Sequence, residues 1–131
     1  MPAVTGLGGV FLKSSEDAAL RAFFSQGLGM DMESWGRVFP WRDRENPERK
    51  GYTVLGMHSP ESDYFRPSTL PFMLNFRVDD LDGVLARLAE LGVMPVRTFE
   101  PEPNGRFVHV SAPGGLTIEL WEPVVEDPYD P

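Results

Sequence analysis

A glutamate and a histidine ten residues apart, near the end of the chain, are the side chains best suited to chemistry. Polar and apolar residues alternate over 116–122, so Glu119 and Trp121 share one face of a predicted strand. A carboxylate beside a tryptophan is partly withdrawn from water, which suits either proton transfer or the binding of a cationic ligand. Alternatively, Glu119 is a structural carboxylate paired with Arg37 or Arg106.

Cooperation between Glu119 and the histidine, His109, depends on the register of the last hairpin. If residues 112–116 form the turn, His109 lies opposite Glu119, whereas a one-residue slip turns its side chain to the other face. We favour the first register because it also makes Phe107 and Trp121 a cross-strand aromatic pair. His109 and Glu119 are therefore the candidate catalytic residues. The alternative for His109 is a core or cleft-wall position with one bonded nitrogen.

Several aromatic side chains and two arginines recur along the predicted strands. Together they predict an apolar cleft with a few polar groups, which is typical of a small-molecule site. Aromatic faces near a carboxylate suit a flat or cationic organic ligand, although each ring could instead be part of the core. The candidate ligand-binding residues are Trp35, Arg37, Phe39, Trp41, Phe107 and Trp121. The second histidine, His58, follows a predicted strand and is expected to be solvated.

Composition excludes several classes of protein. The absence of cysteine rules out disulfides, thiolate metal sites and a cysteine nucleophile. With 12 basic and 20 acidic side chains the net charge is −8, which argues against nucleic-acid binding. No apolar run is long enough for a membrane span and no signal segment opens the sequence, so we expect a cytoplasmic protein without a membrane partner. The glycines of 6–9 precede a strand rather than following one, which is wrong for a phosphate-binding loop.

The 131 residues suit one domain, and two segments of it show the same order of elements. In the first segment, an apolar run over 7–12 predicts a strand, and apolar residues at helical spacing over 20–28 predict a helix. In the second segment, 72–78 predicts a strand and 81–91 a helix. A glycine follows each helix and is expected to end it.

Three further strands are expected after each helix. They lie near Met32–Trp35, Arg37–Trp41 and Tyr52–Met57 in the first segment and near Met94–Phe99, Arg106–Val110 and Leu116–Trp121 in the second. Gly9 and Met73 are 64 residues apart, as are Gly51 and Gly115, which indicates a repeat.

The expected organisation is a single domain over residues 1–131. It comprises module one at about 6–58, a connector at 59–70, module two at about 71–123 and an acidic tail at 124–131. We expect an α+β fold in which two tandem βαβββ modules form a curved eight-stranded mixed sheet around a cleft, with the helices outside.

Several short motifs accompany this duplicated order. They are Phe23-Phe24 before Leu28-Gly29, the run Phe76-Arg77-Val78-Asp79-Asp80-Leu81-Asp82, Leu91-Gly92-Val93, and Pro113-Gly114-Gly115 followed by Ile118-Glu119-Leu120-Trp121-Glu122-Pro123. In this order, over about residues 6–123, they resemble the vicinal oxygen chelate superfamily, which includes glyoxalase I, bleomycin-resistance proteins and extradiol dioxygenases. The resemblance implies the fold described above and a homodimer.

The resemblance also identifies four positions that hold a divalent metal in metal-using members, on the first and last strand of each module. Here these positions fall on Gly9, Leu55, Met73 and Glu119. Only the glutamate can bind a divalent ion, and a catalytic ion usually needs about three protein ligands. We therefore expect no metal cofactor at these positions. The remaining metal alternative is a displaced site that uses Glu119, His109 and Glu122.

Two functions of different classes follow for the cleft. The first is a metal-free protein, similar to the bleomycin-resistance members, that binds a hydrophobic or cationic small molecule. The alternative is a lyase, isomerase or dioxygenase-like enzyme that uses Glu119 and His109, with or without the displaced metal. A third class is a scaffold whose sheet edge or aromatic surface docks a partner protein.

Overall fold

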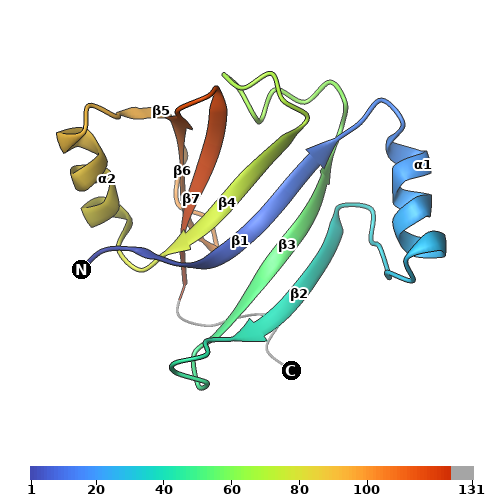
Figure 1. Cartoon of the computed structure of the whole chain (residues 1–131), viewed down its shortest axis with the longest axis horizontal. Coiled ribbons are helices and arrows are strands. Elements are labelled where there is room, and N and C mark those ends of the chain that lie inside the picture. The colour runs from blue at the N-terminus through green and yellow to red at the C-terminus, as the bar shows by residue number, and fades with distance from the viewer. Residues whose placement is uncertain (125–131) are drawn as a thin grey trace.

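The computed structural model describes residues 1–124, which form an α+β fold with a mixed sheet (Figure 1). The elements are β1 (Val4–Lys13), α1 (Asp17–Ala22), the π-helical turn η1 (Phe23–Gly27), β2 (Gly36–Arg42), β3 (Lys50–His58), β4 (Phe72–Val78), α2 (Leu81–Glu90), β5 (Pro95–Thr98), β6 (Gly105–Ala112) and β7 (Leu116–Pro123). Both predicted helices are confirmed. The acidic tail predicted over 124–131 lies, apart from Val124, outside the described residues.

Within residues 1–124 the sheet has seven strands in the order β2-β3-β1-β4-β7-β6-β5. β1 pairs with β3 and β4 pairs with β7 in parallel, whereas all other neighbours, including the central pair β1 and β4, are antiparallel. Figure 1 shows the sheet curving, so that β6 and β7 turn away from the plane of β1 to β3.

The predicted strand at Met32–Trp35 is wrong, and with it the eight-stranded sheet. Glu33 and Gly36 instead exchange backbone hydrogen bonds of 2.8 and 3.2 Å in a tight turn that leads into β2. Gly36 has a φ of 135°, which a residue with a side chain rarely adopts. The turn connects the helical segment to β2, at the edge of the sheet.

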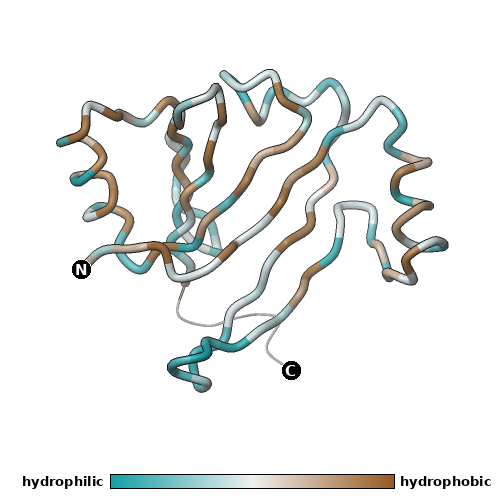
Figure 2. Tube along the Cα trace, in the orientation of Figure 1, coloured by the Kyte–Doolittle hydropathy of each residue, from teal (hydrophilic) through white to brown (hydrophobic). Residues whose placement is uncertain are grey.

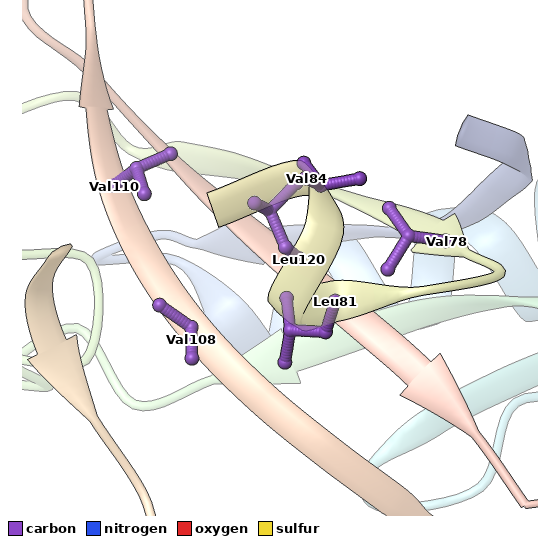
Figure 3. Packing of buried hydrophobic residues seen from close by; sticks show 6 residues of the cluster. All are labelled: Val78, Leu81, Val84, Val108, Val110 and Leu120. Atoms are coloured by element: carbon purple, nitrogen blue, oxygen red, sulfur yellow. The ribbon is translucent and has the colours of Figure 1, made fainter. Parts of the chain in front are cut away.

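The hydrophobic core lies between α2 and one face of β4, β6 and β7 (Figure 3). It is formed by Val78, Leu81, Val84, Val108, Val110 and Leu120, with Phe76 and Ile118 packed against it. The apolar residues Ile118 and Leu120 of the last strand therefore face α2. The first turn of α2 is fixed by two carboxylates, because Asp80 accepts from the Gly83 amide at 3.1 Å and Glu122 from the Leu81 amide at 2.9 Å.

The first helix differs from the second in its packing. No residue of α1 is buried within the described part of the chain, and Phe23 and Leu28 are 57% and 58% exposed. Figure 1 shows α1 at the opposite end of the molecule from α2. Figure 2 shows hydrophobic segments along it and a hydrophilic loop between β2 and β3. Neither described helix has the length and apolar content that a membrane crossing would require.

The connector between β3 and β4 is held against the ends of the strands rather than projecting from them. Phe65 is fully buried, and the Ser68 amide donates to the Thr117 hydroxyl on β7 at 3.1 Å. The Lys13 ammonium donates to the Ser62 carbonyl at 3.1 Å. These contacts bring the connector over the face of the sheet opposite the hydrophobic core.

Candidate functional site

The last hairpin has the register that we predicted from the aromatic pair. His109 lies opposite Glu119, and Phe107 lies opposite Trp121. The two aromatic rings are stacked, with centroids 5.6 Å apart and planes only 11° from parallel. Because side chains alternate along a strand, all four lie on the face away from α2.

Glu119 is the centre of a buried hydrogen-bond cluster, with only 1% of its surface exposed. Its Oε2 contacts His109 Nε2 at 2.7 Å and also accepts from the Tyr64 hydroxyl. Its Oε1 accepts from Asn75 Nδ2 on β4 at 2.6 Å. Both carboxylate oxygens are therefore engaged by the chain itself, and the partners are not the arginines that the sequence had suggested.

The contacts of this cluster favour one tautomer of the imidazole. His109 is fully buried, and among the described residues its Nδ1 has no hydrogen-bond partner. A proton on Nδ1 would bury a donor without an acceptor, so the geometry fits the tautomer protonated at Nε2. In this state Glu119 accepts three hydrogen bonds, from an imidazole, a phenol and an amide.

Tyr64 reaches the cluster from the connector and was not among the predicted site residues. Burial, followed by the charge of Glu119 and the hydrogen bond to it, holds the pKa of the Tyr64 hydroxyl well above its usual range. Its ring stacks on His58, with centroids 5.3 Å apart, and meets His109 edge-on at 4.8 Å. The sequence feature that could have identified Tyr64 is the Tyr-Phe pair that it forms with Phe65 in an otherwise polar connector.

Beside this cluster lies a pocket of about 400 Å³. Its lining is rich in aromatic rings from both halves of the sheet. The lining residues are Gly8, Phe11, Trp35, Tyr52, Val54, His58, Tyr64, Asn75, Phe99, Glu102, Asn104, Phe107, Glu119 and Trp121. Of the six candidate ligand-binding residues, Trp35, Phe107 and Trp121 are among them.

The other three candidates lie outside this lining. Arg37 donates to the Asp31 carbonyl at 3.2 Å, and its guanidinium lies 5.6 Å from the centre of the Phe39 ring. The indole of Trp41 donates to the Thr53 hydroxyl at 2.8 Å. These side chains were predicted to line the cleft because the sequence of β2 does not distinguish its two faces.

His58 is not the solvated residue that we expected. It packs edge-on against Phe11 at 5.4 Å and Phe65 at 5.1 Å, in addition to its stack with Tyr64. Burial lowers the pKa of its imidazole, which outweighs the opposing effect of the Glu119 charge. The fold of the connector over the end of β3 explains the difference.

A buried arginine packs against the faces of three aromatic rings near the pocket. The guanidinium of Arg77, on β4, lies 4.7 Å from the ring centre of Trp121, 5.2 Å from that of Tyr52 and 5.5 Å from that of Trp41. Arg77 is 8% exposed. The chain's own cation therefore makes contacts of the kind that we had expected for a cationic ligand.

Comparison with known proteins bears on the fold. A methylmalonyl-CoA epimerase from Mycobacterium tuberculosis has a TM-score of 0.60 at 22% identity, over 92% of this chain and 89% of that one. A methylmalonyl-CoA epimerase in complex with methylmalonyl-CoA and NH4+ has a TM-score of 0.66 at 16% identity, over 96% and 100%. The chain shares the fold of these two epimerases, as the resemblance to the vicinal oxygen chelate superfamily predicted.

A third solved structure is that of TnmS3, an antibiotic binding protein from Streptomyces sp. CB03234. It is 24% identical over 93% of this chain and 98% of its own, with a TM-score of 0.38. No protein-family model and no curated protein matches the chain. The likeness to the two epimerases shows a shared fold, and function has to be argued from the site.

The metal positions associated with the vicinal oxygen chelate fold do not hold a suitable set of ligands here. In the pairing of β1 with β3, Gly9 lies opposite Val54, and Leu55 lies opposite Val10. On the other side, Asn75 rather than Met73 lies opposite Glu119. Residues 1–124 contain no cluster of three or more His, Cys, Asp or Glu side chains that could hold a metal ion.

The displaced metal site is not assembled either. Glu122 lies on the opposite face of β7 from Glu119, where it accepts from the Leu81 amide and lies 3.6 Å from the Arg106 guanidinium. That arginine also binds Asp82 at 2.9 Å, so it stabilises the start of α2 and does not enter the pocket. The residues present therefore do not fit a divalent metal.

Proposed function

We propose that this protein binds a flat, largely apolar small molecule in the aromatic pocket without using a metal ion. The observation that carries the proposal is a 400 Å³ pocket lined by aromatic rings, whose buried carboxylate is already engaged by three side chains of the chain. This volume is within the range usual for small-molecule sites, and a predominantly aromatic lining with few polar groups is typical of them.

The shape of the lining favours a planar ligand. Phe107 and Trp121 are stacked with their ring planes 11° from parallel, and both contribute to the pocket lining on the second half of the sheet. Trp35, from the turn before β2, contributes an indole that is 44% exposed. A planar ring system could stack on such surfaces at little entropic cost, because the rings are already held in place.

The charges around the pocket favour a neutral ligand over the cationic one. Glu119 accepts three hydrogen bonds, and Arg77 covers the rings of Trp121 and Tyr52. A cationic ligand would have to displace these contacts or bind at Glu102, the other carboxylate of the lining, which is solvent-exposed. Of the two ligand types predicted from the sequence, we therefore retain the hydrophobic one and not the cationic one.

A second candidate is proton transfer, as in an isomerase or lyase. It is favoured by one observation: Tyr64 and His109 both bond to the same oxygen of Glu119, beside the pocket. The two epimerases with this fold act by name on methylmalonyl-CoA, a class of substrate that could be tested here. Turnover that Glu119→Gln abolishes in a folded protein would establish this candidate.

The test of binding uses compounds with one ring system and different charge: naphthylmethanol, naphthylmethylammonium and naphthoate, measured by isothermal titration calorimetry. We expect naphthylmethanol to bind most tightly, and Trp35→Ala to weaken it roughly tenfold through loss of a stacking surface. Phe39→Ala is the matched control, because Phe39 is 42% exposed but does not line the pocket. Equal effects of the two substitutions, or no binding at all, would refute the proposal.

Two further expectations belong to this proposal. The tandem-module organisation is supported by the matching parallel pairs β1 with β3 and β4 with β7. The homodimer implied by the resemblance would show as a dimer mass in sedimentation equilibrium, and a concentration-independent monomer would exclude it.

A further inference from the structure

The tyrosine that completes the Glu119 cluster differs from the other two donors in its origin. Asn75 and His109 lie on strands of the sheet, whereas Tyr64 comes from the connector. Tyr64 and Glu119 both line the pocket, and the Tyr64 hydroxyl occupies a hydrogen-bonding position on Oε2 of the carboxylate. While this bond is made, that position is closed to a ligand.

From this geometry we infer that Tyr64 is a specificity-determining residue, whose hydroxyl closes Glu119 to cations and restricts the pocket to neutral ligands. The inference rests on the proposed function and adds the selection mechanism. Removing the hydroxyl alone should open a site for an ammonium group at the vacated position on Oε2.

The packing of Tyr64 holds its hydroxyl at the carboxylate. Its ring is stacked on His58, tilted against Phe99 with centroids 5.7 Å apart, and capped by the Arg97 guanidinium at 5.5 Å. The next residue, Phe65, is fully buried and anchors the connector. Because the pKa of Tyr64 is raised by burial and by Glu119, the phenol remains a donor at physiological pH.

The energetics favour replacement of a lost donor. A buried carboxylate that loses one of its hydrogen-bond donors carries a desolvation cost that a new donor can relieve. After Tyr64→Phe, Glu119 would keep Asn75 and His109 but lose its third donor. An ammonium group is the ligand chemistry that supplies both a donor and a compensating positive charge.

The experiment compares naphthylmethanol with naphthylmethylammonium on the wild type, Tyr64→Phe and Tyr64→Phe/Glu119→Gln, each checked for folding by circular dichroism. Relative to the alcohol, we expect the ammonium compound to gain roughly tenfold or more in affinity on Tyr64→Phe, the value of a charge-assisted hydrogen bond. The double variant should return to the wild-type ratio. An unchanged ratio in Tyr64→Phe would overturn the inference.

A second measurement keeps this test separate from the proposed function. Melting temperatures are taken in methylammonium chloride and in sodium chloride at equal ionic strength, since methylammonium needs no aromatic pocket. Selective stabilisation of Tyr64→Phe, absent from the wild type and from the double variant, supports the inference even if no naphthyl compound binds. Equal stabilisation of wild type and Tyr64→Phe, or stoichiometric zinc on the wild type that Glu119→Gln removes, would contradict it.

Discussion

In the half of the sheet built from β4 to β7, α2 and the strands bury six aliphatic side chains, whereas the half built from β1 to β3 uses glycines and aromatic rings. The buried carboxylate and its imidazole partner also belong to the β4–β7 half. The β1–β3 half contributes Phe11, Tyr52 and Val54 to the pocket, with Trp35 from the turn before β2. Its helix, α1, buries no residue.

This difference shows how one strand order can serve two purposes. In both halves the first strand pairs in parallel with the last strand of the same half. The β4–β7 half adds a covering helix and a core, which supply the stability. The β1–β3 half omits side chains where the pocket needs room: at Gly8, an added Cβ would lie 2.0 Å from the Asn75 Oδ1 and 2.9 Å from the Trp121 ring.

The largest expected effect tests where the stability resides. Leu81→Ala, in α2, removes a fully buried side chain, and it should lower the free energy of unfolding by about 2–5 kcal/mol. Phe23→Ala, at the end of α1, removes a larger side chain that is 57% exposed, and should change it by less than about 0.5 kcal/mol. Urea denaturation measures both. Comparable losses would show that α1 is as important to the core as α2.

A smaller effect tests how the two halves meet. Gly8→Ala should push Asn75 away from Glu119 and cost about 1–3 kcal/mol, because the added methyl group has no room. The matched control is Gly27→Ala, where the Cβ would meet only the Phe23 ring at 3.6 Å, an ordinary contact. The same denaturation measurement applies to both, and a neutral Gly8→Ala would show that β1 does not constrain the cluster.

The smallest effect concerns the connector that joins the halves. The pKa of Tyr64 is raised in the folded protein, so above about pH 10 the unfolded chain loses this proton while the folded protein retains it. Stability should therefore fall as the pH rises above about 10, and fall less steeply in Tyr64→Phe. Chemical denaturation between neutral pH and pH 11 measures the difference. Parallel profiles for the two proteins would mean that Tyr64 is not buried against Glu119.

Much of the β4–β7 half could be predicted from the sequence. Alternation placed Glu119 and Trp121 on one face, and the aromatic pair with Phe107 fixed the register that brings His109 to Glu119. The helical spacing of apolar residues over 81–91 predicted a helix, and the structure contains this helix at Leu81–Glu90. These predictions succeeded because each depends on neighbours in sequence or across one short turn.

The β1–β3 half and the connector were harder to predict for identifiable physical reasons. The two halves differ by one residue in register: Leu55 lies opposite Val10, whereas the 64-residue offset from the Asn75 and Glu119 pair would place it opposite Phe11. The strand predicted at Met32–Trp35 is a tight turn because Gly36 adopts a positive φ. Tyr64 meets Glu119 across 55 residues of sequence, a contact that no local pattern encodes.

The place of β2 at one edge of the sheet has a consequence for the behaviour of the protein in concentrated solution. An edge strand presents unpaired backbone groups that can template another chain and lead to aggregation. In β2, Pro40 removes one backbone donor, and the flanking Arg37 and Arg42 place positive charge along the same short strand. This sequence makes the edge a poor template for a further strand, so it protects a sheet with open ends from growing into fibres.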